Sequence, residues 1–136
     1  MNVFIKRISI STGPGIGLIN ITDEVEKVLR EANVNNGLCI IYTPHTTTAI
    51  IVNEDEYGLK QDIIRIIEEF FKPGGDWHHN KVDMNAHAHL GAIFLGSARV
   101  IPVANGKLGL GTWQNIFLVE MDGPRRRNVD IIIIGN

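Results

Sequence analysis

Two apolar segments separated by a short polar interruption constrain this chain most strongly. Leu38–Tyr42 and Ala49–Val52 have the composition of buried strands, whereas Thr43–Thr48 between them contains a proline, a histidine and four threonines. A buried strand gains nothing from these polar groups, because each costs free energy unless it is hydrogen-bonded. Pro44 also lacks the amide hydrogen of a sheet ladder, so the chain is predicted to leave the sheet there. We interpret the interruption as a functional site.

The composition is that of one soluble globular domain. Its 136 residues suffice for a hydrophobic core, and 44% hydrophobic with 21% charged residues is ordinary for such a domain. The net charge of -2 gives no overall attraction to nucleic acid or to a membrane surface, so neither is expected as a partner. A cytoplasmic location is expected, because Met1–Ile10 lacks a signal-peptide pattern and no apolar run is long enough to span a bilayer.

Cysteine usage narrows the chemistry further. Cys39 is the only cysteine, so an internal disulfide and a four-thiolate zinc site are both excluded. It lies within an apolar run and is predicted to be a small buried hydrophobic residue rather than a reactive thiol.

Periodicity predicts strands over much of the chain and helices in three segments. A helix is predicted to begin at Thr22 or Asp23, because apolar residues recur at helical spacing as far as Ala32. A second helix is predicted at roughly Leu59–Phe71, and Ala86–Leu95 is predicted as a shorter one. The strand-like segments are Val3–Ser11, Leu18–Ile21, Leu38–Tyr42, Ala49–Val52, Ser97–Val103, Lys107–Leu110, Ile116–Met121 and Val129–Ile134.

This order of elements favours an α+β fold over a doubly wound sheet, because strand and helix do not alternate regularly. We expect one domain over residues 1–136, with a mixed or antiparallel sheet, two main helices and a β-meander at the end. Asn105–Gly106 predicts a tight hairpin turn, and residues 77–85 are predicted to form a loop. The four consecutive isoleucines at 131–134 indicate a strand covered on both faces, or one covered by a partner subunit.

Five histidines are candidates for metal binding or for acid/base chemistry. Four of them lie within residues 78–89, and His45 lies in the polar interruption. Three imidazoles with an open fourth position describe a catalytic zinc site. His78 and His79 point apart if extended, and His87 and His89 point apart if helical, so one of each pair is expected to face His45. If residues 87–89 are extended instead, both His87 and His89 could face the same way. The ordinary alternative is that these are surface or capping histidines, since no spacing matches a zinc motif such as His-Glu-x-x-His.

Other polar residues suggest contacts with an anion. The hydroxyls of Thr46–Thr48 and nearby amides suit phosphate or carboxylate oxygens, although a threonine-rich edge strand explains them equally well. Glu54 is a candidate base, or a partner that orients a histidine, and is otherwise part of a solvated acidic loop. Arg125 could bind an anion with its planar guanidinium or simply occupy a solvated turn. Gly106–Gln114 lacks the spacing of a phosphate-binding loop.

Several motifs together resemble the YjbQ family, over nearly the whole chain. They are Pro44–Thr47, Asn53–Glu54, His79, Ala88–Leu90, the segment Gly106–Gln114 with its Gly-Thr-Trp-Gln end, and Asp122–Arg125. The resemblance implies a compact α+β protein that forms a homotrimer, with a polar pocket near the subunit contacts. It also implies a secondary thiamine-phosphate synthase activity.

Carried over residue by residue, the resemblance assigns roles to the candidate site. The implied metal ligands are His45, His79 and His89. The implied catalytic residues are Glu54 and His45, and the implied substrate-binding residues are Thr46, Thr47, Asn53, Thr112, Gln114 and Arg125. A divalent metal is expected, with zinc favoured over magnesium because histidine nitrogens suit zinc.

Three functions follow as hypotheses. The first is a metal-dependent transferase that joins a pyrimidine diphosphate to a thiazole phosphate and releases pyrophosphate, with a small phosphorylated molecule as its partner. The second is a metal-dependent hydrolase of a small phosphoester or amide at the same site. The third is a trimeric module that binds an anion or a metal and catalyses nothing.

Overall fold

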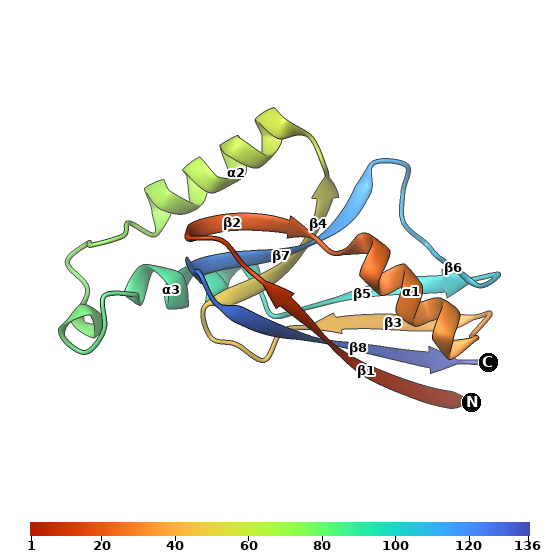
Figure 1. The fold of residues 1–136 in the computed structure, drawn as a ribbon. Coiled ribbons are helices and arrows are strands. Elements are labelled where there is room, and N and C mark those ends of the chain that lie inside the picture. Colours follow the sequence, from red (N-terminus) through yellow and green to blue (C-terminus); the bar gives the residue numbers. More distant parts are fainter.

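A computed structural model describes residues 1–136 as an α+β fold of eight strands, three α-helices and one short 3-10 helix (Figure 1). The strands are β1 (Asn2–Ser11), β2 (Gly15–Asn20), β3 (Gly37–Tyr42), β4 (Thr48–Glu54), β5 (Ala98–Ala104), β6 (Lys107–Leu108), β7 (Gln114–Gly123) and β8 (Arg126–Gly135). The helices are α1 (Thr22–Ala32), α2 (Tyr57–Phe70), the 3-10 helix η1 (His78–Lys81) and α3 (Ala86–Leu95). The expected fold class is confirmed.

The strands form two antiparallel sheets. The first has the order β1-β8-β3-β5-β6 and the second has the order β2-β7-β4. The main core lies where both sheets and α1 meet, and it includes Val28 of α1, Ile131 of β8 and Leu118 of β7. A smaller core packs the other face of the three-stranded sheet against α2 and α3 through residues such as Ile67 and Ala88. The three-stranded sheet is therefore buried on both faces.

Local sequence explains the bounds of the helices. Val25, Val28 and Leu29 form one buried stripe of α1, as the periodicity predicts, and Asn33 ends the helix in a left-handed conformation with φ of 54°. The side chain of Glu56 accepts hydrogen bonds from two backbone amides in the first turn of α2. No helix is both long and apolar enough to cross a membrane.

Turn chemistry also follows the sequence. Asn105 and Gly106 both have positive φ, 53° and 73°, and join β5 to β6 as the predicted hairpin. The predicted loop at residues 77–85 instead contains η1, a single turn too short to show periodicity.

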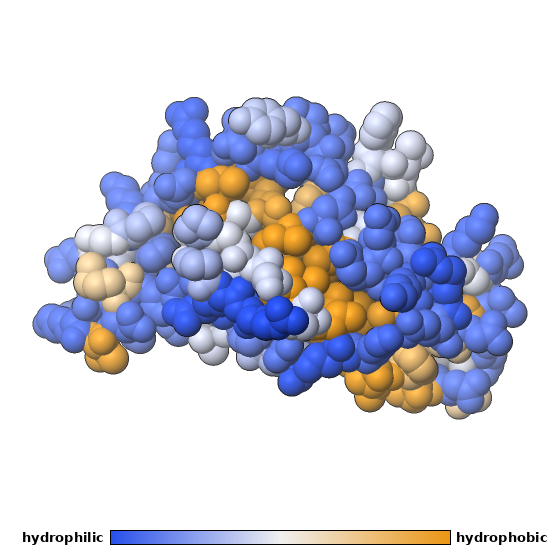
Figure 2. All heavy atoms as spheres, in the orientation of Figure 1, coloured by the Kyte–Doolittle hydropathy of each residue, from blue (hydrophilic) through white to orange (hydrophobic).

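Within a single chain, only two of the four consecutive isoleucines at 131–134 lie in the core. Ile131 and Ile133 are fully buried, whereas Ile132 and Ile134 are only partly buried on the outer face of the five-stranded sheet. Directly opposed residues continue this outer face in apolar rows across neighbouring strands. The rows are Val3, Ile134, Leu38 and Pro102, and then Ile5, Ile132, Ile40 and Val100. Figure 2 shows apolar surface along the lower edge of the molecule, where β1 begins.

Candidate functional site

A cavity of about 400 Å³ opens between the end of β3 and α3. It forms because the chain leaves the five-stranded sheet after Tyr42 and enters the three-stranded sheet at Thr48, so the predicted polar interruption crosses between the sheets. The lining residues are Tyr42, Thr43, Pro44, His45, Thr46, Thr48, His89, Ala92, Ile93, Gly96 and Ser97. Hydroxyl groups and two imidazoles thus surround a small space with an apolar part contributed by α3.

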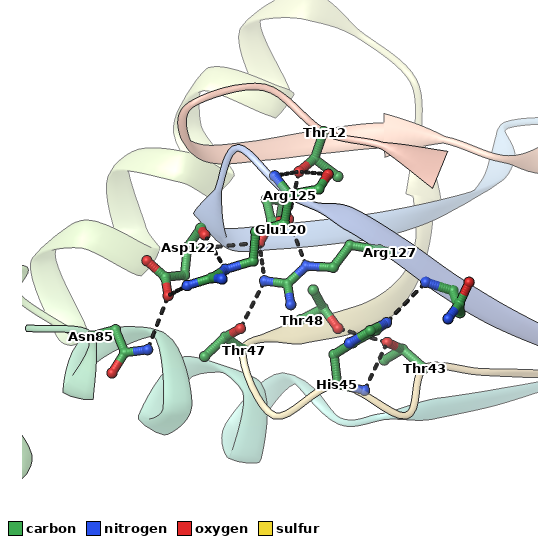
Figure 3. Close-up of polar contacts among 11 residues, drawn as sticks. Thr12, Thr43, His45, Thr47, Thr48, Asn85, Glu120, Asp122, Arg125 and Arg127 are labelled. Atoms are coloured by element: carbon green, nitrogen blue, oxygen red, sulfur yellow. Dashed lines mark hydrogen bonds and ion pairs between the residues drawn. The ribbon is translucent and has the colours of Figure 1, made fainter. Parts of the chain in front are cut away.

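Hydrogen bonds hold the crossing segment, Thr43–Thr48, in place (Figure 3). The hydroxyls of Thr43 and Thr48, two residues of the cavity wall, lie 2.6 Å apart and form a hydrogen bond with one another. The backbone amide of Thr43 donates to the carbonyl of Ser97 at 2.9 Å, which joins the segment to the start of β5. These contacts satisfy polar groups that would otherwise be buried without partners.

His45 is fixed by the main chain of β8. The backbone amide of Asn128 donates a hydrogen bond to His45 Nε2 at 2.9 Å. Burial, and after it the nearby charge of Arg127, lowers the pKa of His45 below its ordinary value. The pKa of His89 is also lowered, first by burial and then by the charge of His79. Both imidazoles in the cavity wall are therefore held in the neutral form near pH 7.

A buried ion pair lies behind the crossing segment and links the two sheets. Arg127 of β8 donates to both carboxylate oxygens of Glu120 of β7, at 2.8 and 2.6 Å, and both side chains are almost fully buried. The carboxylate also accepts from the Thr12 hydroxyl at 2.6 Å and from the Asp122 amide at 3.0 Å. Burial alone raises the pKa of Glu120, but these hydrogen bonds, with that from Arg127 the largest, bring it below its ordinary value.

The same ion pair determines the role of Thr47. Arg127 Nη2 donates to Thr47 Oγ1 at 2.7 Å, and Thr47 is buried and does not line the cavity. Thr46, which is exposed, does line it. Of the two threonines predicted to bind substrate, the structure places only Thr46 where a ligand can reach its hydroxyl.

A second series of hydrogen bonds leads from the turn between β7 and β8 to the other histidines. Arg125 Nη2 and Asn85 Nδ2 each donate to Asp122 Oδ2 at 2.9 Å (Figure 3). The amide oxygen of Asn85 therefore faces His79 Nε2, 2.9 Å away, so His79 carries its proton on Nε2. The His79 ring lies edge-on to that of His89, with 4.7 Å between centroids. Arg125 supports this series and already has a carboxylate partner.

The donors of one chain do not fit the expected metal ion. No group of three or more His, Cys, Asp or Glu side chains is arranged to hold one. His45 Nε2 accepts the amide hydrogen of Asn128, while His79 faces His89 and Asn85. A zinc ion on His45, His79 and His89 stays a prediction from the family resemblance.

Four other predicted site residues lie at the far end of the three-stranded sheet. Glu54 ends β4 and pairs with Gln114 of β7, and Asn53 pairs with Asn115. The length of β4, six steps of about 3.3 Å from Thr48 to Glu54, separates this end from the His45 cavity by roughly 20 Å. The fourth residue, Thr112, lies in the turn just before Gln114. Glu54, Asn53, Thr112 and Gln114 are not beside His45 within one chain.

Sequence reasoning missed the buried pair and favoured Arg125 among the three arginines. A signal was present: Arg127 lies two, four and six residues before Val129, Ile131 and Ile133, and therefore on the buried face of a strand. A single carboxylate, Glu120, inside the apolar run of β7 is the complementary signal.

Comparison with protein-family models shows a match over residues 6–136 to the family described as UPF0047 protein YjbQ-like. A UPF0047 protein of Archaeoglobus fulgidus is 45% identical over 122 residues, which covers 90% of this chain and 94% of the relative. The UPF0047 protein YugU of Bacillus subtilis is 36% identical and covers 96% of this chain and 99% of its own length.

Solved structures agree with the fold. A YbjQ-like protein of Sulfolobus solfataricus P2 superposes with a TM-score of 0.97 at 50% identity, covering 99% of both chains. A protein of Aeropyrum pernix K1 superposes with a TM-score of 0.96 at 47% identity, covering 98% of this chain and 99% of the other. The structural similarity therefore covers almost the whole chain.

Proposed function

The chain belongs to the YjbQ-like UPF0047 family, and we propose that its cavity beside His45 and His89 binds a small phosphorylated molecule. We propose further that the protein is a transferase with a secondary thiamine-phosphate synthase activity. The observation that carries the first proposal is the cavity itself, which combines two neutral imidazoles with exposed hydroxyls in about 400 Å³. Ligand sites commonly have volumes of this order and a few converging polar groups.

An adjoining hollow supports a two-part ligand or two neighbouring ligands. A second cavity, of about 360 Å³, shares His89 with the first and is lined by Trp77, His78, His79, Ala86, His89 and Leu90. Its wall is largely aromatic and apolar, which suits a planar ring, while the first cavity offers the hydroxyls that suit phosphate oxygens. Joining two substrates across His89 is consistent with a transferase.

The proposed reaction requires only a few protein groups. Release of pyrophosphate needs donors that stabilise the negative charge on the leaving group. Thr46 and the two imidazoles can donate hydrogen bonds there, and His89, with its lowered pKa, is suited to move a proton near neutral pH. Arg127 is buried and committed to Glu120, so it organises the site rather than contacts the ligand, whereas Arg125 is half exposed beside Asp122.

We also propose that the chain assembles as a homotrimer through the outer face of its five-stranded sheet. Val3, Ile5 and Val100 on this face are each more than half exposed in the single chain. Contiguous exposed apolar surface of this kind commonly marks a protein interface. The proposed location is the cytoplasm, where a free buried thiol such as Cys39 stays reduced.

The activity is tested by pyrophosphate release from a pyrimidine diphosphate and a thiazole phosphate. We expect turnover by the wild-type chain and a loss of about a hundredfold or more in His89→Gln, because this group is placed to move a proton. His87→Gln is the matched control, since His87 lies on the same helix but lines a different hollow.

Two outcomes would contradict the proposal. Equal losses in His87→Gln and His89→Gln would indicate damage to α3 rather than loss of a reacting group. Binding of pyrophosphate by the wild-type chain without turnover of either substrate would leave the cavity as an anion-binding site and replace the transferase by the binding module.

A further inference from the structure

The hydrogen bond at His45 determines which of its ring nitrogens carries the proton. A backbone amide can only donate, so the amide of Asn128 at 2.9 Å requires a lone pair on His45 Nε2. The neutral ring must then carry its hydrogen on Nδ1. The tautomer is fixed by main-chain geometry in β8 rather than by another side chain that could rotate.

The Nδ1–H group has no partner within the chain. The side chain of His45 makes one hydrogen bond, through Nε2. Its Nδ1 has no partner and is not buried. His45 also lines the cavity of about 400 Å³. Its Nδ1–H is therefore an oriented, unused donor at the accessible surface.

We propose that His45 binds an oxygen atom of the ligand through Nδ1–H and does not act as a metal ligand. This rests on the proposed function, in which the cavity binds a phosphorylated molecule, and it identifies the group that meets His45 as a phosphoryl oxygen. A metal ion at Nδ1 would require the proton there to leave, and a metal at Nε2 would require the Asn128 hydrogen bond to break. The ligand oxygen requires neither change.

The contrast with His79 strengthens the assignment. His79 Nε2 donates to Asn85, so the Nδ1 of the neutral ring keeps its lone pair. The fold thus fixes two imidazoles in opposite tautomers, one a donor on a ring that lines the first cavity and the other a ring beside His89 with its lone pair on Nδ1. A shared metal site would need lone pairs directed to one point.

The tautomer can be read directly by NMR of the complete chain labelled with ¹⁵N. Long-range ¹H–¹⁵N correlation spectra distinguish a ring protonated on Nδ1 from one protonated on Nε2. We expect the Nδ1–H pattern for His45 in the ligand-free protein at neutral pH, with the signal assigned by its loss in His45→Asn. Addition of inorganic phosphate is expected to shift this Nδ1 signal.

Two substitutions separate the ring positions. His45→Asn can place an amide donor near the position of Nδ1, whereas His45→Gln can place its amide near Nε2. We expect inorganic phosphate to bind about tenfold more tightly to His45→Asn than to His45→Gln, the ratio expected for one hydrogen bond to a charged group. His87→Asn is the control and should bind phosphate as the wild-type chain does.

The outcomes distinguish this inference from the proposed function. An Nε2–H pattern for His45, equal phosphate affinity in the Asn and Gln variants, or Zn²⁺ coordinated by His45 would overturn the inference alone. Absence of phosphate binding by the wild-type chain at millimolar concentration would overturn both. A His45 Nδ1–H pattern with the expected order of affinities supports both.

Discussion

At the scale of single residues, the buried pair of Glu120 and Arg127 organises the site. It joins β7 to β8 and holds the Thr47 hydroxyl, and it places the charge of Arg127 where, after burial, it lowers the pKa of His45. A buried pair is weak evidence for stability in itself, because desolvation offsets much of the attraction. The pair instead fixes the position of the crossing segment through the Thr47 hydroxyl.

Removal of one partner should be costly. Arg127→Met leaves the Glu120 carboxylate buried without its counter-ion, and we expect a loss of about 3–5 kcal/mol in the free energy of unfolding, measured in urea. Arg126→Met, at the adjacent exposed position, should change it by less than about 0.5 kcal/mol. Equal effects of the two substitutions would contradict the assigned burial.

Stability should depend on pH in one direction. The pKa values of His45 and His89 are lower in the folded chain, so the unfolded chain binds more protons as pH falls through the ordinary histidine value of about 6.5. Thermal unfolding measured from pH 8 to pH 5 should therefore show a falling melting temperature. Below the folded pKa values this histidine contribution levels off.

Carboxylates add to the same trend at lower pH. The pKa values of Glu120 and Asp122 are also held below their ordinary values, so the stability they contribute is lost as pH falls from those ordinary values through the folded ones. His45→Gln with His89→Gln should flatten the curve between pH 7 and 5.5 and leave the more acidic loss in place. A melting temperature that rises on acidification would contradict both assignments.

At the scale of elements, the sequence predicts strands and helices far better than it predicts the site. The bounds of α3 agree with the apolar segment Ala86–Leu95, and the Asn105–Gly106 turn follows from its two residues. Within one chain, β4 separates predicted site residues that lie close together in sequence, because an extended strand carries them apart. His45 and Glu54 are nine positions apart, but His45 precedes β4 and Glu54 ends it, at the far end of the three-stranded sheet.

Helix α2 offers a test at this scale. The Glu56 side chain accepts from the amides of Gly58 and Leu59, and these hydrogen bonds lower its pKa. We expect Glu56→Ala to destabilise the start of α2, seen as faster amide hydrogen exchange in its first turns. Glu69→Ala, which removes only an exposed pair with Arg65, should leave that exchange nearly unchanged. Equal exchange in both variants would show that the cap contributes nothing.

At the scale of the whole molecule, the outer sheet face explains why four isoleucines follow one another. Two of them fill the core, and the other two belong to apolar rows that the single chain leaves partly open. Period-two alternation reports only which residues share a face, so the sequence could not say whether another part of this chain or a second copy covers it.

Assembly through this face is open to a direct test. We expect the wild-type chain to sediment as a trimer at micromolar concentration, and Ile5→Lys with Val100→Lys to sediment as a monomer, because both charges would be buried without partners. Ile66→Lys, an exposed apolar position on α2, is the control and should keep the wild-type mass. A wild-type monomer, or a variant with unchanged mass, would contradict the proposed interface.

We propose that the space where the chain crosses between the sheets binds phosphate groups. The most direct measurement is a crystal structure of the wild-type protein grown with millimolar pyrophosphate. We expect density for pyrophosphate between His45, Thr46 and His89, with an oxygen within hydrogen-bond distance of His45 Nδ1. Pyrophosphate bound elsewhere on the molecule, with only water in this cavity, would contradict it.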